Sequence, residues 1–130
     1  MKLGDRFTQD FEITKVVYHG FIEIFRDRNE LHTDGAFARA KGFQSEVMHG
    51  NILNGFLSYF VGECLPIRNV IIHSQEIKFA KPVYMGDRLK LQAEISGIFD
   101  SVGALEFKFQ FQNESGTNVA KGRLQVGVLS

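Results

Sequence analysis

Hydrophobic and polar positions follow different periods in the two halves of the chain. Over residues 15–25 apolar side chains recur at helical spacing, and Val17 and Phe21 fall on one face. Over residues 88–95 and 105–112 apolar and polar side chains alternate strictly. Such alternation is typical of strands that bury one face and expose the other. The sequence therefore predicts helices first and an antiparallel sheet afterwards.

The most informative helix is expected over residues 49–62, which contain no Asp, Glu, Lys or Arg. Beside its apolar face runs a stripe of small or polar residues, namely Asn51, Gly55, Ser58 and Gly62. A helix without a charged face has to be covered nearly all round. The pattern therefore predicts an α+β fold in which the antiparallel sheet wraps around this central helix. We expect dimerisation to cover the sheet edge and helix flank left open.

Cap and turn signals set the other boundaries. Thr14 is expected to cap the helix over residues 15–25, and Asp34 a short helix that ends near Gly42. Further strands are expected at residues 8–14, 70–79 and 118–128, with a turn at 113–116. No repeat or linker divides the chain, so the sequence predicts a single domain over residues 1–130.

Composition narrows the function. The 15 basic and 15 acidic side chains cancel, which disfavours nucleic acid as a partner. The one cysteine, Cys64, cannot form an internal disulfide, and no secretory signal or membrane-spanning stretch is evident. We therefore expect a soluble cytoplasmic protein without a membrane partner. Cys64 is interpreted as a structural residue.

Asp27, Asn29 and His32 lie within six residues, between two helical patterns. On one continuous helix Asp27 and His32 would not share a face, so they converge only if the helix ends between them. Asn29 tolerates a turn conformation. A carboxylate and an imidazole at one point can activate a water, because imidazoles titrate near neutrality. The alternative is that Asp27 ends a helix and His32 is an ordinary half-buried histidine.

Other candidate residues begin the central helix or lie along it. Gly50 is expected at the helix N-terminus, where free N–H groups and the helix dipole favour a developing negative charge. Gly50 could equally serve only a tight turn, and Ser58 could bond a carbonyl one helical turn earlier. The histidines and Cys64 show no spacing typical of metal ligands, so no metal site is predicted.

Together these motifs resemble the MaoC-like hydratases of the hotdog fold, in particular the (R)-specific enoyl-CoA hydratases. The family motif Asp-x-Asn-x-x-His matches "DRNELH", and the following "HG" is His49–Gly50. Ser58 stands nine residues after His49, where a family serine lines the site. "LP" at 65–66 and "FAKPVYMGD" at 79–87 continue the match.

The resemblance implies a hotdog fold and a hydratase mechanism. Asp27 and His32 would activate a water that adds to C3 of a trans-2-enoyl thioester, or act in reverse on a (R)-3-hydroxyacyl thioester. The Gly50 amide would stabilise the enolate-like oxygen, and Asn29 would orient the turn or the water. Ser58 and His49 complete the implied substrate-binding set. No cofactor is expected beyond the CoA or phosphopantetheine of the substrate.

The sequence leaves open the reaction, the carrier and the acyl group. A hotdog thioesterase or a non-catalytic acyl-thioester binder remains an alternative to the hydratase. The carrier is acyl-CoA or an acyl carrier protein, and the basic residues that would contact it are scattered in sequence. Glu30 follows Asn29 where the family often has proline, and Asn51 and Asn54 replace usually apolar residues. If either asparagine faces the acyl group, a short or polar acyl chain is expected.

Overall fold

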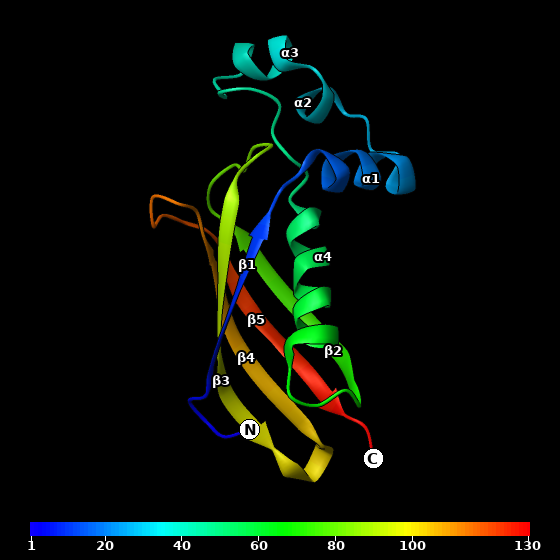
Figure 1. The fold of residues 1–130 in the computed structure, drawn as a ribbon, viewed down its shortest axis with the longest axis vertical. Helices are drawn as coiled ribbons and strands as arrows, with labels where there is room; N and C mark the ends of the chain where they lie inside the picture. The colour runs from blue at the N-terminus through cyan, green and yellow to red at the C-terminus, as the bar shows by residue number, and fades with distance from the viewer.

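A curved antiparallel sheet cradles one helix along its inner face in the computed structural model, which describes residues 1–130 (Figure 1). The strand order is β1-β3-β4-β5-β2, and every neighbouring pair is antiparallel. The strands are β1 (Arg6–Glu12), β2 (Val70–Phe79), β3 (Arg88–Phe99), β4 (Ala104–Gln112) and β5 (Asn118–Val128). The predicted α+β arrangement, a sheet wrapped around a central helix, is confirmed.

The helices divide into one central helix and a group at one end of the sheet (Figure 1). The group consists of α1 (Lys15–Phe25), α2 (Glu30–Thr33) and α3 (Gly35–Ala40). The central helix is α4 (Asn51–Tyr59), and both chain termini lie at the opposite end of the sheet (Figure 1). None of the helices is both long and apolar enough to cross a membrane.

The predicted caps form. The Thr14 hydroxyl accepts a hydrogen bond of 3.1 Å from the Val17 N–H at the start of α1. The Asp34 carboxylate accepts from two backbone N–H groups at the start of α3. Each cap satisfies backbone donors that have no partner inside the helix, so these side chains set where the helices begin.

The core lies between α4 and the inner face of the sheet. The helix contributes Ile52, Leu53 and Leu57, which are buried. The alternation in β4 places Leu105, Phe107, Phe109 and Phe111 in the same core. Burying a side chain of this size contributes roughly 1.5–3 kcal/mol, so the two periods seen in the sequence hold the helix on the sheet.

The central helix differs in one respect from the prediction. Regular α-helical geometry ends at Tyr59, and a π-helical turn, Phe60–Cys64, follows before Pro66. Phe60 and Val61 of this turn are buried. Helical periodicity over residues 49–62 could not distinguish the π-helical turn, because such a turn is a short continuation of an α-helix.

Alanine substitutions at two glycines test how tightly the sheet and α1 are packed. A Cβ at Gly122 of β5 would overlap the carbonyl oxygen of Glu76 on β2, whereas a Cβ at Gly20 of α1 would meet nothing within 4 Å. We expect Gly122→Ala to destabilise the fold by about 1–3 kcal/mol or more. Gly20→Ala should stabilise it by roughly 0.5–1 kcal/mol. Urea unfolding measures both, and equal effects would contradict the described packing.

Candidate active site

The segment between Asp27 and His32 turns sharply, as the sequence predicts. Helix α1 ends at Phe25, and Arg26 adopts a left-handed conformation with φ 63°. The Asp27 Oδ1 atom then accepts a 3.2 Å hydrogen bond from the Asn29 N–H. The Asn29 side chain caps α2 by accepting a 3.0 Å hydrogen bond from the Leu31 N–H. His32 therefore lies on a second short helix, which the sequence does not distinguish from a plain turn.

His32 is held on both sides by groups that are distant in sequence. The Tyr18 hydroxyl donates a 2.6 Å hydrogen bond to the His32 carbonyl. The His32 Nδ1–H donates a 2.7 Å hydrogen bond to the Val47 carbonyl. Since Nδ1 carries the proton, Nε2 of the neutral ring has a free lone pair. That nitrogen can accept a proton from a reactant.

The sequence reasoning missed Tyr18. Burial and, to a smaller extent, the Glu46 carboxylate raise the pKa of its hydroxyl, which therefore keeps the proton that it donates. The sequence offered only one clue, a tyrosine within the helix expected over residues 15–25. If such a tyrosine is buried, its hydroxyl normally has a hydrogen-bond partner. That signal could not name His32 as the partner.

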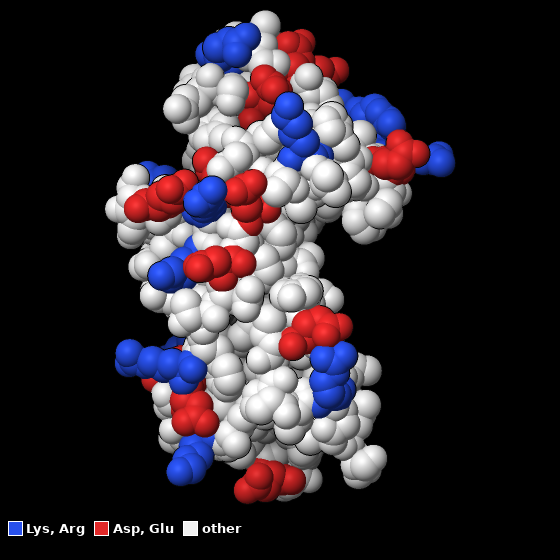
Figure 2. Space-filling view, viewed as in Figure 1, with Lys and Arg blue, Asp and Glu red and all other residues white.

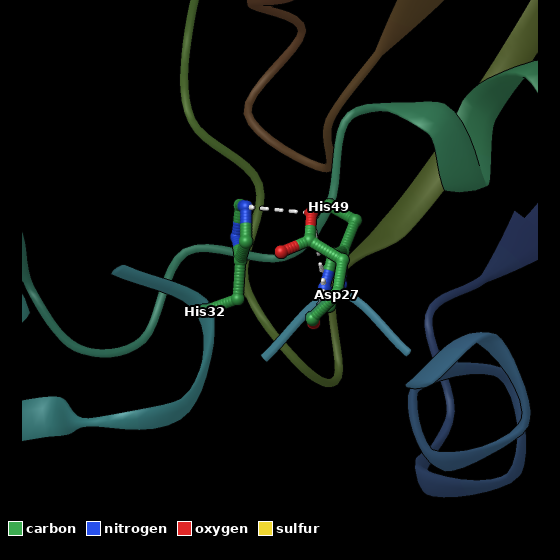
Figure 3. Close-up of side chains that lie close together, drawn as sticks. All are labelled: Asp27, His32 and His49. Atoms are coloured by element: carbon green, nitrogen blue, oxygen red, sulfur yellow. Dashed lines mark hydrogen bonds and ion pairs between the residues drawn. The ribbon is translucent and has the colours of Figure 1, made fainter. Parts of the chain in front are cut away.

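The Asp27 and His32 side chains lie close enough for one water beside them to contact both. The Asp27 carboxylate points toward the His32 ring (Figure 3), and Oδ2 lies 3.8 Å from Nε2. This distance is too long for a direct hydrogen bond and suits a bridging water. The Asp27 side chain is 50% exposed and that of His32 is 18% exposed. A reactant from solvent can therefore reach the pair.

His49 fixes the backbone of Asp27. It is 2% exposed, and its Nε2–H donates a 2.8 Å hydrogen bond to the Asp27 carbonyl. Its ring stacks on His32 with centroids 4.0 Å apart, and its Nδ1 has no partner. The resemblance predicts a substrate contact for His49, whereas its ring is buried and committed to Asp27. We therefore interpret His49 as a positioning residue.

The charge state of His49 follows from its surroundings. Burial lowers its pKa, and the neighbouring His32 lowers it further. The hydrogen bond to the Asp27 carbonyl and the Asp27 charge act in the opposite direction but do not reverse the shift. His49 is therefore neutral at neutral pH, and the stacked pair does not carry two positive charges.

Two hollows flank the Asp27–His32 pair, one on each side. The α1 hollow, of about 740 Å³, lies between α1 and α4 and is lined in part by Asp27 and Asn54. The β2 hollow, of about 420 Å³, lies next to the end of β2 and is lined in part by His32 and Gly50. Asn51 borders both. A reactant that spans the pair therefore passes Asn51.

Gly50 begins α4, as predicted, and its N–H makes no hydrogen bond within the chain. A Cβ at this position would lie 2.9 Å from Cε1 of the Phe79 ring. A side chain at this position would therefore push the Phe79 ring aside, in addition to any effect on the free N–H. The sequence reasoning anticipated the N–H but not the aromatic ring against it.

The other two predicted binding residues lie apart from the hollows. Ser58 is exposed on α4 and borders neither hollow. Asn29 borders neither, because its side chain caps α2. The described contacts therefore support Asn29 as a residue that shapes the turn, and Ser58 stays a prediction.

The fold also brings three potential metal ligands together. One atom each of Asp27, His32 and His49 lies within 4.8 Å of the others, although the sequence spacing predicts no metal site. The His49 Nε2–H is committed to the Asp27 carbonyl and the His32 Nδ1–H to the Val47 carbonyl. A metal bound through His49 Nε2 would have to displace the first of these bonds. The donor set therefore suits proton transfer better than metal binding.

Known proteins resemble this chain in sequence and in structure. The sequence model described as "MaoC like domain" matches residues 5–115. An (R)-specific enoyl-CoA hydratase from Aeromonas caviae is 32% identical over 78 residues, which are 60% of this chain and 58% of the relative. A 3-hydroxybutyryl-CoA dehydratase from Methylorubrum extorquens is 33% identical over 65% of this chain and 54% of the relative. The matches thus span less than two thirds of either relative.

A plant relative matches along the whole chain. The mitochondrial 3-hydroxyacyl-[acyl-carrier-protein] dehydratase of Arabidopsis thaliana is 25% identical over 99% of this chain and 73% of its own length. Among solved structures, an (R)-hydratase from A. caviae superposes with a TM-score of 0.90 at 23% identity, covering 98% of this chain and 97% of that one. This likeness shows that the chain has the hotdog fold.

The buried His49 generates a pH-dependence prediction. Its pKa is lowered in the folded state, so unfolding takes up a proton as the pH falls below the unfolded value of about 6.5. Its contribution to the free energy of unfolding is therefore present above pH 6.5 and decreases toward lower pH, by at most about 1.4 kcal/mol per pH unit. His49→Gln keeps an N–H for the Asp27 carbonyl and should remove this slope.

Urea unfolding at pH 7.5 and pH 5.5 measures the difference between wild type and variant. The control is His19→Gln, because His19 is exposed on α1. It should retain the wild-type pH dependence. The assignment is wrong if His49→Gln and His19→Gln behave alike.

Proposed function

Since the chain belongs to the MaoC-like domain family, we propose that it is a hydro-lyase acting on acyl thioesters. It adds water to trans-2-enoyl thioesters to form (R)-3-hydroxyacyl thioesters and catalyses the reverse dehydration. The observation that carries the proposal is the pairing of Asp27 with His32 across a 3.8 Å gap. At that separation one water beside the pair can contact the carboxylate and the imidazole at once.

The hydrogen bonds of His32 assign its part in the reaction. Its Nδ1–H is committed to the Val47 carbonyl, so Nε2 is the atom that accepts a proton from the water. Asp27 Oδ2 accepts the hydrogen bond of the second water proton. The hydroxide equivalent forms a bond to C3, electron density moves onto the thioester oxygen, and the proton held by His32 is delivered to C2. The net change is the addition of one water, and both His32 and Asp27 return to their starting protonation states.

Gly50 is suited to the thioester oxygen. Its free N–H lies at the start of α4, where the helix dipole favours negative charge. A donor already oriented in the resting protein stabilises the developing enolate without reorganisation. His49 supports the pair by fixing the backbone of Asp27.

The two hollows suggest how the substrate lies. We place the carrier arm in the β2 hollow, because Gly50 and the cationic Lys81 line it. The acyl group then enters the α1 hollow, whose wall is mostly apolar apart from Asp27 and whose mouth is seen beneath α1 in Figure 2. The reacting carbons lie between the hollows, beside the Asp27–His32 pair. The relatives act on CoA thioesters or on an acyl-carrier-protein thioester, so the carrier is one of these two.

We further propose that the protein is a homodimer of the cytoplasm. Strand β2 is a ten-residue edge strand, and an exposed edge of this length is normally paired or covered. Large apolar side chains are also exposed on α1 and α4, among them Ile24, Phe25 and Tyr59. The single Cys64, whose pKa is raised by burial and by Glu63, is suited to a reducing compartment.

Hydration of crotonyl-CoA tests the proposed reaction. We expect wild-type protein to remove the enoyl absorbance, and Asp27→Asn and His32→Gln each to lower kcat by roughly 10²-fold or more, because each removes one partner of the water. Asp10→Asn and His19→Gln are matched exposed controls and should retain activity. Release of free thiol without hydration would instead identify a thioesterase, and full activity of both site variants would refute the mechanism.

Sedimentation equilibrium tests the dimer. The expected mass is about twice the 14.7 kDa of one chain. A monomer that is fully active at the same concentration would contradict the proposed assembly but not the proposed reaction.

A further inference from the structure

A row of side-chain amides runs from β2 to Asn51, the residue that borders both hollows. Asn51 and Asn54 lie on α4, and Gln75 lies on the neighbouring β2. The Asn54 amide N–H donates a 2.8 Å hydrogen bond to Asn51 Oδ1. The Gln75 amide N–H in turn donates to Asn54 Oδ1. The three amides therefore form a chain with a single direction, from β2 toward Asn51.

This chain ends on an unused donor. Both carbonyl oxygens of the asparagines accept hydrogen bonds, whereas the Asn51 NH₂ group donates none within the protein. Consecutive hydrogen bonds polarise one another, so the terminal N–H groups are better donors than those of an isolated amide. Asn51 borders both hollows and Asn54 borders the α1 hollow. The free donor is thus next to the space assigned to the acyl group.

The rest of the α1 hollow is mostly apolar. Its wall includes Val17, Phe21, Ile24, Phe25, Ile52 and Phe56. No lysine or arginine lines it, and the one acidic group there is the Asp27 carboxylate. A carboxylate on the acyl chain would meet repulsion from Asp27 without a compensating cation. An uncharged oxygen would meet an apolar surface and an amide donor.

We propose, building on the hydratase function above, that the preferred acyl group carries an uncharged hydrogen-bond acceptor, a hydroxyl or keto oxygen, which binds the Asn51 amide. A plain hydrocarbon chain would displace water from the Asn51 N–H groups and offer no replacement. Asn51 is therefore a specificity-determining residue, and Asn54 and Gln75 orient it.

A set of matched thioesters tests this preference. The substrates are trans-hex-2-enoyl-CoA, its 5-hydroxy and 6-hydroxy derivatives, and the derivative with a terminal carboxylate. The measurement is kcat/KM from the loss of enoyl absorbance. We expect at least one hydroxylated ester to exceed the plain ester by roughly tenfold, the value of about one hydrogen bond. The carboxylate ester should be the poorest substrate.

Two variants assign the preference to the amide row. Asn51→Leu should abolish it and raise kcat/KM for the plain ester severalfold, a gain that an unfolded protein could not show. Asn54→Leu leaves Asn51 in place without its partner and should weaken the preference. The control is Gln110→Leu, which breaks a similar amide pair, Gln110 with Gln92, on the strands β4 and β3. It should leave the preference unchanged.

The outcomes separate this inference from the function on which it rests. If all uncharged esters are hydrated at equal rates, or if Asn51→Leu retains the hydroxyl preference, the substrate inference is overturned and the hydratase function stands. A preference for the carboxylate ester also overturns the inference. If no ester is hydrated, the proposed function fails and the substrate inference fails with it.

Discussion

The uncharged helix α4 is the constraint on which fold and site both depend. A helix with no charged face is stable in water only if other elements enclose it. The alternating strands provide that enclosure, because one face of each strand is apolar and packs against Leu53 and Leu57. The start of α4 cannot be enclosed in the same way, since its first N–H groups have no partner inside the helix. The segments between β1 and α4 gather at that end.

A buried imidazole joins those segments. His49, two residues before the start of α4, donates to the Asp27 carbonyl and stacks on the His32 ring. Tyr18 reaches the same place from α1 and fixes the His32 backbone. The exposed Asp27 is thus positioned by buried neighbours. This arrangement keeps a carboxylate accessible to reactants without leaving its backbone free to move.

Local sequence signals predicted most of the fold, because they act within a few residues. Thr14 and Asp34 cap their helices where expected, and the strand alternation placed four strands of the sheet correctly. The convergence of Asp27 and His32 was also local: the sequence predicted a helix end between them, and α1 ends at Phe25, just before Asp27. The partners of this pair were not predictable in the same way. The contacts of Val47 and Tyr18 with His32 span about 15 residues and depend on how the helices pack.

The stacked imidazoles of His32 and His49 can together hold only one extra proton, because only His32 is free to accept one. Burial keeps His49 neutral, so of the two imidazoles it is His32 that holds the proton removed from water in the proposed reaction. That proton and the hydroxyl group then both come from one side of the substrate plane. The geometry therefore implies a syn addition, in which the hydrogen at C2 and the hydroxyl at C3 arrive on the same face of the double bond.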